Sequence, residues 1–170
     1  MKYTKVIKVL LLIISFVLCC SCTSAPKENA LSITVDEFID NMNNEISKEI
    51  SNSIKITGYD ELIKGDFECS SNVPSWFQIS GECTDDKRIK SINMEVNRLD
   101  NDKLNYAASG LFLRCLFISL FSEEILNEFL SENMDDLTGK ISVPEGTCYV
   151  KFATNMNTKQ EKYEINLLSE

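Results

Sequence analysis

Four cysteines outside the N-terminal region are the residues best suited to chemistry: Cys69, Cys83, Cys115 and Cys148. No two of them have the short spacing that is typical of zinc sites. The chain contains no histidine, so a cysteine or serine nucleophile has no imidazole base and an imidazole-dependent metal site is excluded. Each cysteine falls at an apolar position of its segment. Two interpretations therefore stay open: disulfide bonds, whose connectivity the sequence does not fix, or buried free thiols.

Acidic side chains are the second group that could do chemistry. The segment Asp100-Asn101-Asp102 begins like a calcium-binding loop, but Leu104 and Leu111 stand where such a loop has oxygen ligands. Capping of the following helix explains these residues better, and Asp85-Asp86 and Asp135-Asp136 are interpreted as turns. Two carboxylates that converge in a pocket could hydrolyse a glycoside, although no pair stands out. We expect no metal and no cofactor.

The charge of the chain limits its partners. It has 17 basic and 26 acidic side chains, and three of the lysines precede residue 9. Residues 23–170 therefore carry 14 basic against 26 acidic groups, a net charge of −12. A surface of this sign repels nucleic acid phosphates, so no nucleic acid partner is expected. It would attract a basic protein or peptide.

The N-terminal region has the order of an export signal. Residues 1–8 contain three lysines and no acid, and residues 9–18 are apolar except for Ser15. Ten residues of helix would span about 15 Å, roughly half of a hydrocarbon core of ~30 Å. A signal peptide therefore fits this stretch better than a permanent membrane helix.

The end of the apolar stretch, Leu18-Cys19-Cys20-Ser21-Cys22, resembles the cleavage site of bacterial lipoproteins. In that class a cysteine after small residues becomes the new N-terminus and carries a diacylglyceryl group. The small Ser21 precedes Cys22, and Thr23-Ser24-Ala25-Pro26 follows it like a tether. Cys19 stands where the class has leucine, and Cys20 is the second choice. An uncleaved N-terminal anchor and a cleaved signal without lipid are the alternatives.

The resemblance implies three parts of the chain: a signal peptide at 1–21, a lipid attachment site and tether at 22–31, and one extracytoplasmic domain at 32–170. The lipid would hold the domain on the cell membrane or outer membrane, facing away from the cytoplasm. Eight residues of tether, from Thr23 to Ala30, reach at most about 28 Å. The domain would therefore lie close to the bilayer.

Apolar spacing predicts the elements of that domain. Thr34 and Glu37 form a capping box before a helix at about 35–50. Alternating apolar residues then predict four strands, near 54–56, 67–69, 76–83 and 88–97. The apolar segment 102–121 is better explained as a buried helix than as a membrane span, because Arg114 lies near its middle.

A second helix follows Ser122, the segment 133–139 is a loop, and the tail forms a hairpin around 155–158. The predicted fold class is α+β, with an antiparallel sheet of about five or six strands packed against the N-terminal helix and the central helix pair. The domain loosely resembles small periplasmic α+β folds such as the cystatin-like fold.

Trp76 is the candidate for contact with a partner. Phe77 is in the core phase of its strand, which leaves Trp76 on the opposite face unless helices cover that face too. The leading interpretation of function is a non-catalytic binding module, because no catalytic motif is present. The alternatives are a cell-envelope hydrolase with paired carboxylates and an exclusion or immunity lipoprotein that blocks a basic toxin.

Overall fold

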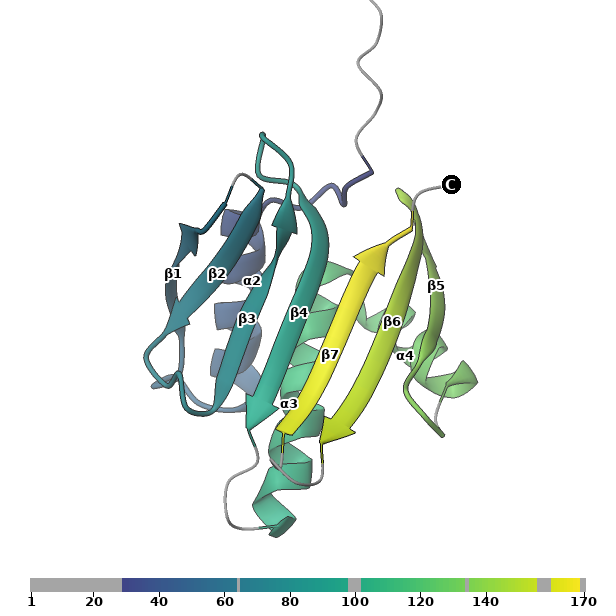
Figure 1. Cartoon of the computed structure of the whole chain (residues 1–170). Coiled ribbons are helices and arrows are strands. Elements are labelled where there is room, and N and C mark those ends of the chain that lie inside the picture. The colour runs from purple at the N-terminus through teal and green to yellow at the C-terminus, as the bar shows by residue number, and fades with distance from the viewer. Residues whose placement is uncertain (1–28, 64, 98–101, 134, 156–159, 169–170) are drawn as a thin grey trace, which may run out of the picture.

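The computed structural model describes residues 29–63, 65–97, 102–133, 135–155 and 160–168, without the side chains of 102–109. One antiparallel sheet of seven strands forms the framework, in the order β1-β2-β3-β4-β7-β6-β5 (Figure 1). The strands are β1 (Ile56–Glu61), β2 (Asp66–Ser71), β3 (Phe77–Cys83), β4 (Ile89–Asn97), β5 (Gly139–Val143), β6 (Gly146–Asn155) and β7 (Gln160–Leu167). The C-terminal strand β7 joins the two hairpin-built halves by pairing with β4.

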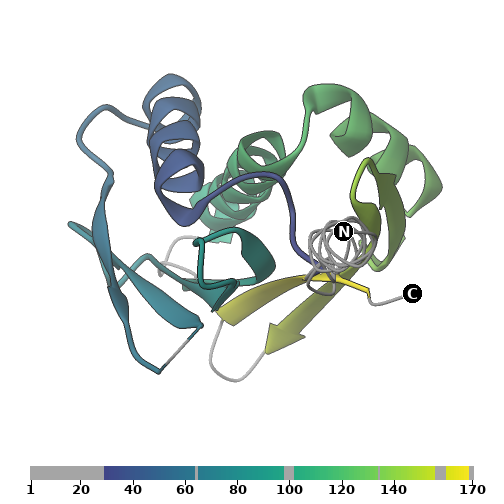
Figure 2. The same cartoon turned by 90° about the horizontal axis from the view of Figure 1, so that it is seen from above.

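Three helices cover one face of this sheet: α2 (Val35–Glu49), α3 (Asp102–Leu120) and α4 (Glu123–Glu132). Figure 2 shows all three on the same side, with the sheet curving toward them at both edges. At those edges α2 contacts β1 and α4 contacts β5. The α+β arrangement with an antiparallel sheet is therefore confirmed.

The predicted capping box starts α2. The Thr34 hydroxyl accepts a hydrogen bond from the backbone N–H of Glu37, and the Glu37 carboxylate accepts one from the backbone N–H of Thr34. The apolar residues at helical spacing then face the sheet, and Phe38, Met42 and Ile46 are fully buried. This one-sided burial is what fixes an amphipathic helix on a sheet.

Strand alternation divides the sheet into two faces. In β2, Phe67 and Cys69 are buried against the helices, while Glu68 and Ser70 are exposed on the other side. A Cβ atom at Gly81 of β3 would lie 3.0 Å from the Phe67 ring, so glycine allows that ring to lie across the neighbouring strand. The core therefore lies entirely between the sheet and the helices.

The apolar helix α3 lies inside this core. Phe112, Cys115, Leu116 and Phe117 are buried. Arg114 points to the margin and donates to Glu123 at 2.8 Å. None of the helices in the described part of the chain is long and apolar enough to cross a membrane.

The cap of α4 agrees with the sequence prediction, whereas the number of strands does not. Ser122 caps α4 as predicted, because its hydroxyl accepts from the N–H of Ile125. The sheet has one strand more than the sequence indicated, since β5 follows directly after the loop at 133–139. The proposed cap at Asp100 or Asn101 and most of the tail turn lie outside the described residues.

Candidate functional site

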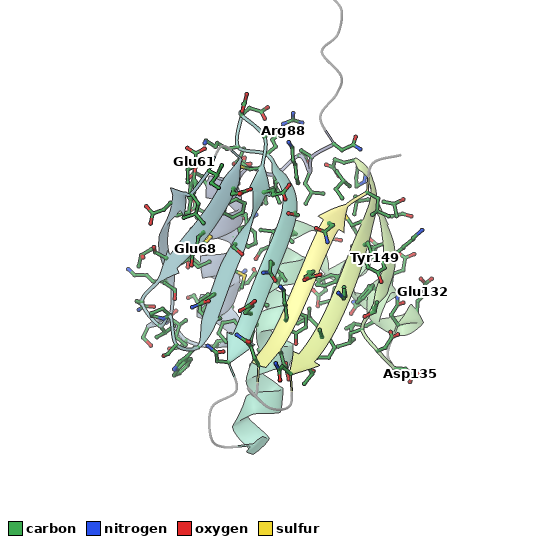
Figure 3. The ribbon with its side chains drawn as sticks, in the orientation of Figure 1. Glu61, Glu68, Arg88, Glu132, Asp135 and Tyr149 are labelled. Carbon is green, nitrogen blue, oxygen red and sulfur yellow. The ribbon has the colours of Figure 1, made fainter. Side chains whose placement is uncertain are left out.

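The face of the sheet turned away from the helices is the candidate site, and we call it the outer face. It consists of the alternate residues of each strand, such as Glu68 on β2 and Tyr149 on β6, which both point away from the helices in Figure 3. No described helix lies over it (Figure 2). Its side chains are mostly polar or charged, and the two halves of the face differ in how those charges are paired.

In the half formed by β4, β7 and β6, opposite charges alternate. Lys162 lies 3.8 Å from Glu95 and 3.2 Å from Glu164, and Glu164 lies 3.8 Å from Lys151. Gln160 also donates to Glu95 at 3.0 Å. Each exposed pair is weak by itself, but together they leave this half nearly neutral.

In the half formed by β1, β2 and β3, like charges oppose each other. Asp60 on β1 is the register partner of Glu68 on β2, and Asp66 on β2 is the partner of Glu82 on β3. Within the described chain, none of the four carboxylates forms an ion pair. Like charges directly opposite each other destabilise a sheet. We call Asp60 and Glu68 the carboxylate pair.

The carboxylate pair lines an open pocket with a volume of about 390 Å³. The pocket lies along β1, β2 and β3, and its other lining residues are Leu62, Cys69, Ser70, Ser71, Pro74, Phe77 and Gln78. The volume falls within the range of small-ligand sites, roughly 300–1,000 Å³. The lining combines two anionic groups with apolar surface at Leu62 and Pro74, and this suits a ligand with a cationic group and an apolar part.

One polar group in the pocket wall lacks a partner. The Ser71 hydroxyl is buried and makes no hydrogen bond with any described residue. A buried hydroxyl without a partner is costly, by about 1–3 kcal/mol. Ser71 has the strand phase of Phe67 and Cys69, so this hydroxyl belongs to the core side of β2 rather than to the outer face.

The pocket has no activated nucleophile among its described residues. Burial, followed by the negative charge of Glu68, raises the pKa of the Cys69 thiol to about 12. The thiol is therefore protonated near neutral pH and is a poor nucleophile. Asp60 and Glu68 are both exposed to water. The two carboxylates can bind a cation, and this binding requires no catalysis.

All four cysteines of the domain are free and buried. Burial is the main cause that raises the pKa of Cys115 and Cys148 to about 12 and the pKa of Cys83 above its usual value. Of the two interpretations that the sequence left open, the structure has the buried thiols. Among the side chains that it describes, no group of three potential ligands lies together as a metal site.

Trp76 lies in a turn directly before β3 and is partly buried against the core. It does not line the pocket, so the structure does not bring the proposed partner contact together with the carboxylate pair. Cys22 and Cys20 lie outside the described residues. Of the calcium-like segment, only Asp102 is described, as the first residue of α3.

Sequence reasoning did not find the carboxylate pair. The signal was present, because alternation from Phe67 and Cys69 puts Glu68 on the face away from the core. Which residue of β1 opposes Glu68 depends on the register of the hairpin, and a bulge between Ile56 and Gly58 shifts that register. The sequence pattern could not give this shift, because a one-residue slip reverses the faces.

No protein-family model, no curated protein and no solved structure matches this chain.

Proposed function

We propose that this chain is a lipid-anchored extracytoplasmic protein that binds a basic peptide or protein segment without catalysis. The anchor is the diacylglyceryl group expected on Cys22, on the cell membrane or outer membrane. The binding site is the outer-face pocket that contains the carboxylate pair. An exclusion or immunity role would be one case of this function, with a basic toxin as the partner.

The observation that supports binding is the uncompensated carboxylate pair in an open pocket. Two acidic residues oppose each other across β1 and β2, although the other half of the same face pairs each glutamate with a lysine. Two like charges that lower the stability of the unliganded protein are expected at a site where a ligand supplies the opposite charge. Binding then favours residues that stability alone would not.

The lining favours a lysine or arginine side chain next to an apolar residue. The cationic group would lie between Asp60 and Glu68, which both line the pocket. Leu62 and Pro74 offer apolar surface in the same pocket. The net charge of −12 beyond residue 22 would speed the encounter with a basic partner.

Paired carboxylates also favour a second candidate, the cell-envelope hydrolase. Directly opposed residues have Cβ atoms about 4.5–5.5 Å apart, which is compatible with the spacing of catalytic carboxyls, ~5–9.5 Å. In such enzymes one carboxyl is usually buried, so that its pKa differs from that of the other. Here both side chains are exposed. Binding therefore accounts for the pocket better than hydrolysis does.

The test is peptide binding by the full chain, purified from membranes in detergent micelles. The probes are fluorescent hexapeptides that contain lysine or arginine beside leucine, with matched glutamate-containing versions. We expect the basic peptides to bind and the acidic ones to fail. The double variant Asp60→Asn, Glu68→Gln should weaken binding at least tenfold, which corresponds to about 1.4 kcal/mol. Binding should also weaken with added salt.

A matched control removes the same charge elsewhere. Glu132 at the end of α4 and Asp135 after it are exposed and lie at the far side of the domain from Glu68 (Figure 3). The double variant Glu132→Gln, Asp135→Asn should bind as the unchanged protein does. Equal weakening in both variants would mean that only net charge matters, and this would contradict the pocket. Cleavage of cell-wall glycan that depends on Asp60 would favour the hydrolase instead.

A further inference from the structure

Two large apolar side chains are strongly exposed at the end of the β1–β2 hairpin. Leu62 is 60% and Ile63 is 72% exposed, and no other large hydrophobic side chain in the described part of the chain is exposed. Single exposed apolar residues are ordinary on protein surfaces. Two adjacent ones at the end of a hairpin are less ordinary, and their role depends on what lies near this end of the sheet.

The hairpin end lies at the same end of the sheet as the point where the N-terminal segment enters the domain, with the β3–β4 turn between them. The backbone N–H of Leu31 donates to Ile89 at 2.7 Å, and that of Val35 donates to Lys87 at 2.9 Å. Lys87 in turn forms an ion pair with Glu61, the residue before Leu62. These contacts link the entry of the chain to the hairpin end, and Figure 1 shows both at the same end of the sheet.

The length of the preceding chain limits how far this end can lie from an anchor. Six residues lie between Cys22 and Asn29, and the seven Cα-to-Cα steps reach at most about 25 Å. The opposite end of the sheet is farther away by the length of the strands. From Gly146 to Ala153, the seven steps along β6 add about 23 Å.

Basic side chains at this end already have acidic partners. Lys87 pairs with Glu61, and Arg88 donates to Asp86 at 2.8 Å. If this end contacts a lipid surface, each cation therefore keeps an opposite charge beside it. The exposed aliphatic pair is the part that gains from leaving water.

We propose that Ile63 inserts into the interfacial region of the bilayer that carries the lipid anchor, with Leu62 at the boundary between the bilayer and the pocket. The inference rests on the anchor at Cys22 and adds an orientation to the proposed function. The domain stands with the β1–β2 hairpin end toward the membrane. Because Leu62 also lines the pocket, the binding site opens beside the bilayer, where it would meet partners that approach along the membrane surface.

The experiment uses the full lipidated chain with Ile63→Trp, reconstituted in phosphatidylcholine vesicles with or without brominated acyl chains. Bromine quenches tryptophan fluorescence only at close range. The unchanged protein gives the contribution of Trp76, the chain's single native tryptophan. The matched control is Ala153→Trp, because Ala153 is exposed on β6 at the opposite end of the sheet.

We expect brominated lipid to quench the added tryptophan of Ile63→Trp at least twofold more than that of Ala153→Trp. Equal quenching in the two variants would overturn the inference. If Ile63→Trp does not fold, Leu62→Trp serves at the adjacent exposed position. Intact mass of the same samples separates the two proposals: a lipidated chain without the difference overturns only the orientation, whereas an unlipidated chain overturns both.

Discussion

At the scale of single residues, the pairing of charges distinguishes the two halves of the outer face. Lys162 lies between Glu95 and Glu164, so these acidic side chains of the half around β7 have a basic partner. Among the residues that the structure describes, no lysine forms an ion pair with the carboxylate pair on β1 and β2. The two carboxylates therefore repel each other in the folded protein whenever the pocket holds no cation.

Removal of one of these charges should therefore stabilise the unliganded protein. We expect Asp60→Asn to raise the free energy of unfolding by a few tenths of a kcal/mol, roughly the size of one cross-strand charge interaction. Denaturant unfolding at low salt measures it, and the gain should fade by about 1 M salt because ions screen the repulsion.

The control for this measurement is Glu132→Gln, which removes an exposed charge that no cross-strand acid opposes. Its stability should match that of the unchanged protein. If Asp60→Asn loses stability instead, Asp60 makes a favourable interaction in the free protein, and the idea of an uncompensated pair is wrong.

The buried thiols give a prediction on pH. The pKa of Cys148 is about 12 in the folded protein, while 9.0 is the ordinary value that applies after unfolding. A raised thiol pKa means that only the unfolded chain releases the proton between these values. This contribution to stability is therefore complete below pH 9 and is lost progressively toward pH 12.

Two measurements check it. Native protein at pH 8 should react with a thiol reagent far more slowly than protein in denaturant, and the free energy of unfolding of Cys148→Ala should fall less steeply above pH 9. Rapid modification of Cys115 and Cys148 in the native protein would contradict their burial.

At the scale of elements, the start of α2 is the best-defined local signal. Thr34 bonds to Glu37 through both halves of the capping box, and the backbone of Thr34 also forms a bridge with Arg88 at the β3–β4 turn. The cap thus joins the helix to the sheet at the end where the chain enters the domain.

Replacement of the cap should weaken the whole domain. We expect Thr34→Ala to lower the free energy of unfolding by about 1 kcal/mol, because one helix N–H loses its acceptor. The neighbouring exposed Ser32 makes no such side-chain bond, so Ser32→Ala is the control. Equal stability of Thr34→Ala and the unchanged protein would show that the capping box is unimportant.

The same cap has a predicted pH dependence. Hydrogen bonds from Thr34 lower the pKa of the Glu37 carboxyl below its usual value. A lowered carboxyl pKa contributes stability at neutral pH, and this contribution is lost as the pH falls through the folded-state value. Glu37→Gln should flatten that part of the acid unfolding curve.

The sequence predicted the elements whose signals are local. The cap of α2, the hydroxyl of Ser122 and the alternation in β3 and β4 depend on neighbours within a few residues. Strand β5 was missed because it has five residues, only Ile141 is buried, and it begins with a glycine and is followed by a proline. Its place at the sheet edge depends on pairing with β6, which is a tertiary contact.

The candidate site was less predictable than the fold for the same reason. Net acidity was visible in the composition and led to the expectation of a basic partner. The position of the carboxylate pair depends on the strand register and on a bulge in β1, neither of which has a sequence signal strong enough to fix a face.

At the scale of the whole molecule, the proposed protein combines a lipid anchor with an oriented domain. The described helices include none that could cross a bilayer, and α3, the most apolar segment, is buried under the sheet. The proposed attachment is the lipid on Cys22, which lies outside the described residues. A domain with its entry point, its exposed apolar hairpin end and its pocket near one another would present the outer face beside the membrane.

The most direct test of this account is the intact mass of the full chain expressed in a lipoprotein-processing bacterium and purified from membranes, beside Cys22→Ala. We predict a species that starts at Cys22, carries acyl mass and is absent from the variant. In denaturant it should show four reactive thiols, from Cys69, Cys83, Cys115 and Cys148, rather than the seven of the whole chain. A full-length species with seven thiols, or a cleaved species without acyl mass, would contradict the anchor.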